Sequence, residues 1–370
     1  MKSNQVQLSD VCDLIAGFAF KSKHFGNYKD KVIKIASITP PTVSMNNLVG
    51  VDLSQYNSSK LGRFVAHTGD YVLAMTGATI GKIGRIESGE AYINQRVLLF
   101  RNKEDKIDKD FLYYTLQQYE FEQYVLGHID SESAQPNISA GTIGKYQFHL
   151  PCLNSQIKIG RFLRLLDKKM ELNRKINENL ARQAQAIYTS MFIENADPTW
   201  RQGYLSDLVT VKYGKDHKKL ADGYYPVYGS GGIMRHVERP LYDKESVLIP
   251  RKGTLNNVMY VNQPFWSVDT MFYTEMRMPN VAKYVYHFVK SKDLASMNAG
   301  SAVPSMTTDI LNAIELAIPN ADALEKFEKI VAPIYFFMQE NYKQSERLSN
   351  IRDVLLPKLM SGEIDLQEVC

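Results

Sequence analysis

The chain has 370 residues, enough for two or three domains. Its composition, 44% hydrophobic and 23% charged, is ordinary for a globular protein, and no apolar run approaches the roughly 18–20 residues that span a bilayer. The N-terminal segment lacks the apolar core of a signal peptide, so we expect a cytoplasmic protein without a membrane partner. The net charge of +4 is too small to indicate a nucleic-acid-binding protein by itself.

The three cysteines are scattered along the chain, at Cys12, Cys152 and Cys370, and have no Cys-x-x-Cys spacing. An odd number of isolated cysteines predicts neither a disulfide framework nor a zinc site. We therefore expect no metal in this chain.

Residues 1–151 are predicted to form a first domain of mixed secondary structure that is mostly β. The reason is that Gly, Pro and Asn separate short runs of apolar or alternating residues in this segment. The predicted strands cover residues 32–38, 70–75, 82–86 and 96–101.

Three loops of this domain combine glycines, amides or cations that suit a nucleic acid. Glycines let the backbone approach a ligand closely, Arg and Lys can hold phosphate or read guanine, and Asn and Gln amides suit adenine. Any one of these loops alone is better explained as a hairpin turn with solvated charges, so the hypothesis depends on the loops together. The residues selected are Lys21, Lys23, Thr79, Lys82, Gln95 and Arg96.

Residues 152–197 predict a first long helix, since no proline interrupts residues 153–192. Seam residues recur alternately three and four positions apart, which is the a/d pattern of a coiled coil. A buried Asn in such a seam lowers stability but fixes register and orientation. The predicted pairing residues are Leu166, Met170, Asn173, Asn177, Leu180 and Ile187.

Residues 198–319 predict a second, shorter domain of the same kind, with strands over 246–249, 257–261 and 271–276. It opens with the Leu-Ser-Asp of residues 205–207, which repeats residues 8–10, and it closes with residues 303–306, which resemble residues 135–138. Between these landmarks the two domains diverge, which suggests one scaffold for two different targets. The loop residues chosen by the same criteria are Lys215, Lys218, Tyr228, Ser230, Arg251, Lys252, Asn256 and Asn257.

Residues 320–370 predict a second long helix, which repeats the first at an offset of 168 residues, the distance from Pro151 to Pro319. A period this long indicates duplication of whole domains, and two such helices in one chain most simply pair antiparallel. Two unrelated surface helices would share this register only by coincidence. Pro333 should kink the second helix or delay its regular start. The second set of pairing residues is Ile334, Met338, Asn341, Leu348 and Leu355.

Arg352 departs from this pattern, because the first helix has Ala184 at the corresponding seam position. It could face a partner subunit or water, and an arginine that extends to solvent at a frayed end explains it equally well.

Catalytic motifs are incomplete. Residues 77–82 are one residue short of a P-loop and lack the Ser/Thr after the lysine, so we reject ATP binding. The Asp-Pro-Thr-Trp of residues 197–200 fails the Asp/Asn-Pro-Pro-aromatic motif of amino-methyltransferases, and no metalloprotease or serine-hydrolase signature is present. We predict that the chain is not itself a catalyst.

Several segments resemble the specificity (S) subunits of type I restriction–modification systems: residues 166–173, LDKKMELN; residues 191–198, MFIENADP; and residues 355–364, LLPKLMSGEI. Residues 228–233 and 250–254 look like elements of the target recognition domains of that family. The resemblance covers essentially the whole chain. It implies an α+β fold in which two mostly β target recognition domains are joined by two long antiparallel coiled-coil helices.

The resemblance also implies a function. Each domain would read one half of a bipartite, asymmetric site on double-stranded DNA, and the helices would set the spacer. Two methyltransferase subunits would dock on the helices, and motor–nuclease subunits would join for restriction. S-adenosylmethionine, ATP and Mg²⁺ would belong to those partners, and no cofactor to this chain.

Two other interpretations stay open. A DNA methyltransferase or nuclease with atypical motifs would show its activity as a purified chain. A coiled-coil adaptor whose domains bind proteins would not show the steep salt dependence of DNA binding.

Overall fold

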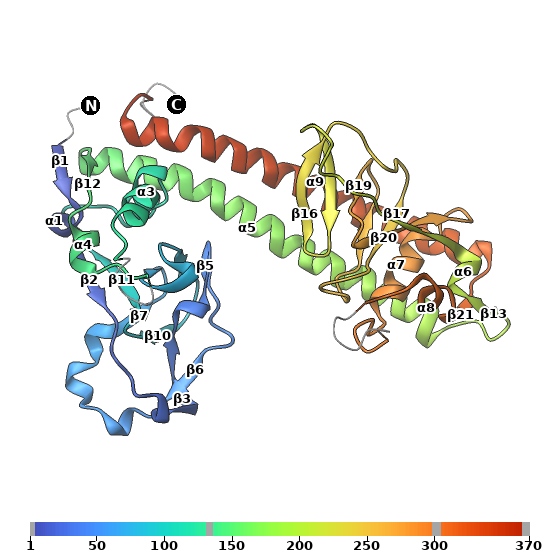
Figure 1. The fold of residues 1–370 in the computed structure, drawn as a ribbon, viewed down its shortest axis with the longest axis horizontal. Coiled ribbons are helices and arrows are strands. Elements are labelled where there is room, and N and C mark those ends of the chain that lie inside the picture. Colours follow the sequence, from blue (N-terminus) through green and yellow to red (C-terminus); the bar gives the residue numbers. More distant parts are fainter. Residues whose placement is uncertain (1–3, 131–135, 298–304, 365–370) are drawn as a thin grey trace. The chain divides into compact units, whose positions relative to one another are not determined.

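The computed structural model describes residues 4–130, 136–297 and 305–364. The chain divides into two compact units, Met1–Leu172 with Gln344–Cys370, and Asn173–Lys343. Each unit contains one mixed domain and one half of each of two long helices, α5 (Leu153–Thr189) and α9 (Ala321–Ser361) (Figure 1). The predicted α+β fold class, a duplication with two long helices, is confirmed.

The domain of the first unit is built around two sheets. Its strands are β1 (Asn4–Gln7), β2 (Cys12–Ala16), β3 (Phe25–Ile33), β4 (Ile38–Thr39), β5 (Thr42–Val43), β6 (Val49–Val51), β7 (Val65–His67), β8 (Tyr71–Ala74), β9 (Ile83–Arg85), β10 (Glu90–Ile93), β11 (Val97–Asn102) and β12 (Gln147–Leu150). Its helices are α1 (Leu8–Val11), α2 (Lys109–Leu116), α3 (Tyr119–Gly127) and α4 (Ala140–Gly144). The larger sheet has the order β2-β11-β8-β9-β5-β4, and the smaller has the order β6-β3-β10-β7.

Strands β8 and β11 are buried on both faces, which explains why their sequences are continuous apolar runs. Alternate side chains point to opposite faces of a strand. Leu73 and Leu98 therefore join the core formed with α2 and α3, whereas Val72 and Leu99 join a separate core.

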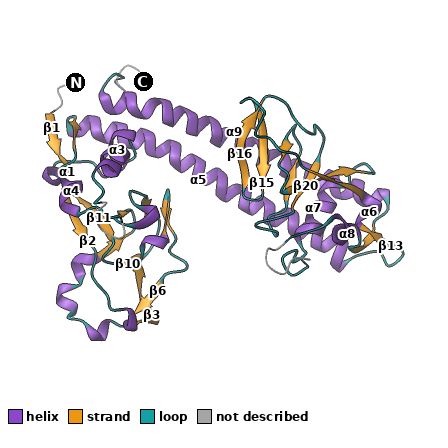
Figure 2. Cartoon of the chain, in the orientation of Figure 1, coloured by secondary structure: helices purple, strands orange, loops and turns teal. Residues whose placement is uncertain are grey.

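The domain of the second unit repeats this layering. Its strands are β13 (Arg201–Tyr204), β14 (Val209–Tyr213), β15 (Tyr225–Gly229), β16 (Gly232–Val237), β17 (Ser246–Pro250), β18 (Met259–Val261), β19 (Trp266–Ser267), β20 (Met271–Met276) and β21 (Glu315–Ile318). Its helices are α6 (Leu205–Leu208), α7 (Ala282–Lys290) and α8 (Thr308–Asn312). The sheet β14-β20-β17-β18 has the same order as β2-β11-β8-β9, and β15 and β16 form a hairpin beside it (Figure 2).

Most of the predicted strands are confirmed, because β8, β9, β11, β17, β18 and β20 lie close to their predicted ranges. Both long helices are present, and residues 365–370, the end of the second predicted range, lie outside the described residues. The strand predicted over 32–38 is wrong: β3 ends at Ile33 and a short 3₁₀ turn follows at Ile35–Ser37. The delayed start of the second helix is also wrong. Helix α9 begins at Ala321, where the Asn320 side chain accepts a hydrogen bond from the Ala323 N–H (2.9 Å), and it continues through Pro333.

Within each unit the two long helices pack antiparallel. In the first unit, Arg352 Nη1 lies 2.8 Å from Asp167 Oδ1, and Leu163 shares a core with Leu359. Arg352 is thus half-buried in an ion pair within the helix pair, which is a role that the sequence did not indicate. Tyr114 of α2 donates a second hydrogen bond to this carboxylate, to Oδ2 at 2.6 Å.

In the second unit the seam residues Asn173 and Asn177 are buried, and Asn341 is half-buried. Asn177 donates to the Met338 carbonyl (3.0 Å), and Asn341 donates to Asn177 Oδ1 (2.8 Å). Asn173 donates to the carbonyl of Asn341, its own equivalent in the repeat (3.3 Å). The other predicted pairing residues are half-buried: Leu166, Met170, Leu180, Ile187, Ile334, Met338, Leu348 and Leu355.

Further deeply buried residues of the helices in the second unit lie outside that seam. Tyr188, Phe192, Phe327 and Tyr335 are buried, and they share one core with α7. The helices therefore pack on their domain as well as on each other. Their buried residues for this reason do not follow the heptad spacing alone.

His287 of α7 joins the domain to both helices. Its Nδ1 lies 2.8 Å from Gln185 Oε1 of α5, and its Nε2 lies 2.9 Å from Tyr335 Oη of α9. A neutral ring with the proton on Nδ1 satisfies both partners. Burial, with a smaller contribution from Lys290, lowers the pKa of His287 to about 4.

We expect this histidine to make the second unit sensitive to acid. Between pH 6.5 and about 4 the unfolded chain binds a proton that the folded chain does not, so the free energy of unfolding falls as the pH falls, by up to about 3 kcal/mol. Urea unfolding at pH 7.0, 5.5 and 4.5 measures this loss. His287→Phe should flatten the dependence, whereas replacement of the exposed His67 by Gln should not. Equal slopes in wild type and His287→Phe would contradict the assignment.

Candidate nucleic-acid interface

Several loops of the first domain meet at one end of its larger sheet. The Gly17 N–H donates to the Val97 carbonyl (2.9 Å), and the Met75 N–H donates to the Arg96 carbonyl (2.9 Å). The Ile138 N–H in turn donates to the Met75 carbonyl (3.0 Å). We call this set of loops, residues 17–18, 75–82, 94–96 and 137–138, loop edge 1.

The second domain has the same arrangement of backbone hydrogen bonds. The Gly214 N–H donates to the Met271 carbonyl (3.0 Å), and the Arg251 N–H donates to the Thr270 carbonyl (2.9 Å). The Met306 N–H donates to the Arg251 carbonyl (2.9 Å). Residues 214–215, 251–257, 268–270 and 305–306 form loop edge 2. Because the hydrogen bonds match, Arg251 is the structural equivalent of Met75, and Thr270 is the structural equivalent of Arg96.

Loop edge 1 gathers four of the six residues predicted in its domain. Thr79 and Lys82 lie in the loop after β8, and Gln95 and Arg96 lie in the turn before β11; the bond from Met75 to Arg96 joins these two segments. The side chains of Lys82, Gln95 and Arg96 are exposed. Lys21 and Lys23 lie elsewhere, where the Lys21 N–H donates to Tyr56 Oη (2.8 Å). Gln135, part of the predicted closing motif, lies outside the described residues.

Loop edge 2 gathers Arg251, Lys252 and the backbone of Lys215, whose N–H donates to the Ser267 carbonyl (2.8 Å). The β15–β16 turn lies against it, because the Asn257 side chain donates to the Ser230 carbonyl (2.7 Å). Tyr228 pairs with Ser267 across β15 and β19.

Two residues predicted in the second domain have other contacts. Lys218 lies in a turn that is held by its N–H donating to Asp216 Oδ1 (3.0 Å). Both ends of the Asn256 side-chain amide are engaged, with Nδ2 donating to Asp293 (3.0 Å) and Oδ1 accepting from the Ala295 N–H (3.0 Å). Residues 303–304 of the predicted closing motif lie outside the described part of the chain.

One glycine in each loop edge, Gly17 and Gly214, packs closely against the turn opposite, and the sequence analysis did not select either of them. A Cβ on Gly17 would lie 2.1 Å from the Asn94 carbonyl oxygen, and a Cβ on Gly214 would lie 2.0 Å from the Val268 carbonyl oxygen. Neither position can accept a side chain without moving the turn opposite. A signal was present in the sequence, because each glycine follows the Leu-Ser-Asp motif of its domain at the same spacing.

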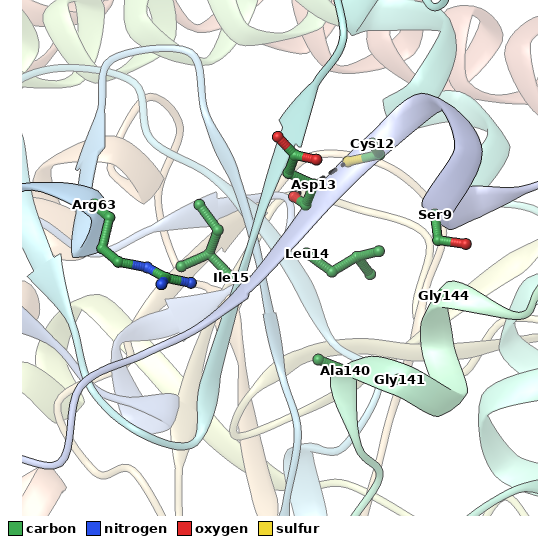
Figure 3. Close-up of a pocket in the computed structure, with 9 residues that line it drawn as sticks. All are labelled: Ser9, Cys12, Asp13, Leu14, Ile15, Arg63, Ala140, Gly141 and Gly144. Carbon is green, nitrogen blue, oxygen red and sulfur yellow. Dashed lines mark hydrogen bonds between the residues drawn. The ribbon is translucent and has the colours of Figure 1, made fainter.

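A cavity of about 680 Å³ lies in the first domain, between edge strand β2, Arg63 and helix α4 (Figure 3). Its chemistry does not indicate catalysis. Burial raises the pKa of the Cys12 thiol to about 12, so that this thiol is protonated near neutral pH and is a poor nucleophile.

Across residues 4–130, 136–297 and 305–364, no three His, Cys, Asp or Glu side chains are grouped to hold a metal ion. In the same described residues, no helix is both long and apolar enough to cross a membrane.

The family model for the Type I restriction modification DNA specificity domain matches residues 2–182 and 198–342. The chain belongs to this family. Its two matched segments correspond to the two repeats found in the sequence. The family assignment makes the chain a DNA-specificity subunit and not the catalyst of a type I restriction enzyme.

Named relatives agree with this assignment. The chain is 23% identical over 316 residues to the type I restriction enzyme MjaIX specificity subunit of Methanocaldococcus jannaschii, covering 73% of each chain. It is 35% identical over 92 residues to the HindI specificity subunit of Haemophilus influenzae, which is 25% of this chain and 18% of the relative. The fold is similar to the crystal structure of a type I restriction–modification S subunit from M. genitalium, with a TM-score of 0.63 and 16% identity over 97% of this chain and 96% of the other.

Proposed function

We propose that each domain binds one half of a bipartite, asymmetric site on double-stranded DNA through its loop edge. The observation that carries this proposal is that one backbone arrangement recurs in both domains with different side chains. Phe18, Gln95 and Arg96 of loop edge 1 are replaced by Lys215, Asp269 and Thr270 in loop edge 2. A shared scaffold with different donors and acceptors is suited to read two different sequences.

We also propose that the long helices set the spacer and dock methyltransferase subunits. Large apolar side chains remain exposed on α5 and α9, and exposed apolar groups on a helix favour contact with another protein. They include Leu165 and Leu172 on α5, and Phe336, Phe337 and Tyr342 on α9. On this proposal the functional divisions are 1–151 and 198–319 for recognition and 152–197 and 320–370 for spacing.

The catalytic cofactors then belong to the partners. S-adenosylmethionine would bind the methyltransferase subunits, and ATP and Mg²⁺ would bind the motor–nuclease subunits. The complex would act on DNA in the cytoplasm.

The proposal predicts that removal of the gene abolishes one methylated motif. Methylated bases are mapped across the host genome with the gene, without it, and with it restored on a plasmid. We expect one bipartite motif to disappear and return, because the methyltransferase without its specificity subunit cannot select sites. If the methylation map is the same with and without the gene in a host that has an active methyltransferase partner, the proposal is wrong.

DNA binding by the purified chain separates the alternatives. Binding to a duplex with the mapped motif should weaken steeply between about 50 and 200 mM salt as counterions are released. A protein-binding adaptor would not bind the duplex, and a methyltransferase would transfer labelled methyl groups without a partner.

A further inference from the structure

The two loop edges each carry an arginine, but at different positions of the shared backbone arrangement. Arg251 lies where loop edge 1 has Met75, which is 6% exposed, and Arg96 lies where loop edge 2 has Thr270. In both domains one backbone hydrogen bond of 2.9 Å joins these two positions. Arg96 accepts it through its carbonyl in loop edge 1, and Arg251 donates it through its N–H in loop edge 2. The cation therefore extends from the end of β17 in one domain and from the turn before β11 in the other.

Arg251 is held in place before any ligand binds. Its guanidinium carbon lies 5.6 Å from the centre of the Tyr213 ring, and its Nη1 donates to the Asp269 carbonyl (3.4 Å). A side chain that is already ordered loses less entropy on binding, which favours a specific contact. Lys252 next to it is exposed and has no side-chain partner among the described residues, as expected for a contact to phosphate.

The residue directly before Arg96, and the equivalent residue before Thr270, differ in a way that indicates contact with bases. Loop edge 1 has Gln95 and loop edge 2 has Asp269, and both are exposed. A carboxylate repels phosphate, but it accepts a hydrogen bond from the amino group of cytosine in the major groove. A Gln amide pairs with adenine. An exposed carboxylate beside Arg251 therefore argues that this part of the edge faces base edges.

We propose that Arg251 and Arg96 each read a guanine, one in each half-site, and that their different positions in a shared scaffold make the half-sites different. Two guanidinium N–H groups donate to O6 and N7 of guanine, which is the commonest specific contact in the major groove. The proposal rests on the DNA-recognition function proposed above. It adds the base that each domain requires and the residue that requires it.

The first test is Arg251→Gln in the host with its partner methyltransferase, read as a genome-wide methylation map. We expect one position of one half-site to lose its requirement for guanine, while methylation of the original motif falls roughly 10- to 100-fold. Arg96→Gln should do the same in the other half-site only. The matched control is Lys252→Gln, which removes a neighbouring charge and should weaken all sites evenly without changing the motif.

A second test moves the arginine. The double variant Arg251→Met with Thr270→Arg gives loop edge 2 the arrangement of loop edge 1. The required guanine should then shift to another position of the same half-site.

Several results would overturn the proposal. Methylation by Arg251→Gln that falls evenly over all sites, with the motif unchanged, would assign the arginine to phosphate. Wild-type behaviour of the variant would remove it from the interface. If thermal unfolding shows that Arg251→Gln is destabilised, Arg251→Met replaces it, since loop edge 1 has Met75 at this position, and an undiminished guanine requirement there counts against the proposal. These failures differ from failure of the proposed function, in which the wild-type chain itself specifies no motif.

Discussion

Replacement of Lys283 by alanine is expected to lower the free energy of unfolding of the second unit by about 3 kcal/mol. The Lys283 side chain is 4% exposed, and its Nζ lies 2.9 Å from Glu245 Oε1 and 2.7 Å from Glu328 Oε1. The Tyr260 ring lies 5.1 Å from the same ammonium. Without the lysine, two partly buried carboxylates face each other's charge with no cation between them.

Urea unfolding of the purified chain measures this effect. The matched control is Lys329→Ala, also on a lysine paired with a glutamate but at the exposed surface of α9, where solvent screens the pair and its loss should change the stability little. A triple variant, Lys283→Met with Glu245→Gln and Glu328→Gln, should recover most of the loss, because it removes the unpaired charges together. Similar losses for Lys283→Ala and Lys329→Ala would contradict the expectation.

The fold was largely predictable because its main elements have simple signals. The core strands β8, β11 and β20 are continuous apolar runs, and the long helices have a period that repeats at 168 residues. Strand β3 was misplaced because most of its residues are exposed or half-buried, so no apolar pattern marks its beginning. Helix α7 was missed because it is short and five of its nine residues are Tyr, Val or Phe, which favour strands.

The loop edges were predictable only as separate segments. Their residues come together through backbone hydrogen bonds between loops far apart in the chain, which composition cannot reveal. The offset between equivalent residues also changes within the domain, from 197 at Gly17 and Gly214 to 168 at Ile138 and Met306. A fixed offset therefore could not pair Met75 with Arg251. Asn256 also shows what the sequence alone cannot reveal. Its side-chain amide could pair with adenine, but both its nitrogen and its oxygen form hydrogen bonds within the domain.

Replacement of Gly214 by alanine is expected to abolish recognition of the half-site read by the second domain. The added Cβ would lie 2.0 Å from the Val268 carbonyl oxygen and 2.5 Å from that of Ser267, and both contacts are with backbone. The turn at residues 268–270 must move, and it carries the carbonyl that accepts from the Arg251 N–H. We expect methylation of the motif to fall more than about 100-fold, with a loss of about 2–4 kcal/mol in stability.

Binding to DNA that carries only one half-site distinguishes a local displacement from general unfolding. Gly214→Ala should lose the half-site of the second domain and keep that of the first, and Gly17→Ala should do the reverse, because its Cβ would meet the Asn94 carbonyl oxygen at 2.1 Å. The matched control is Gly62→Ala, where a Cβ has no neighbour within 4 Å, and it should bind as wild type. Normal binding by Gly214→Ala and Gly17→Ala would mean that recognition does not depend on the loop edges. Opposite losses in the two variants would tie each half-site to the backbone arrangement of one domain.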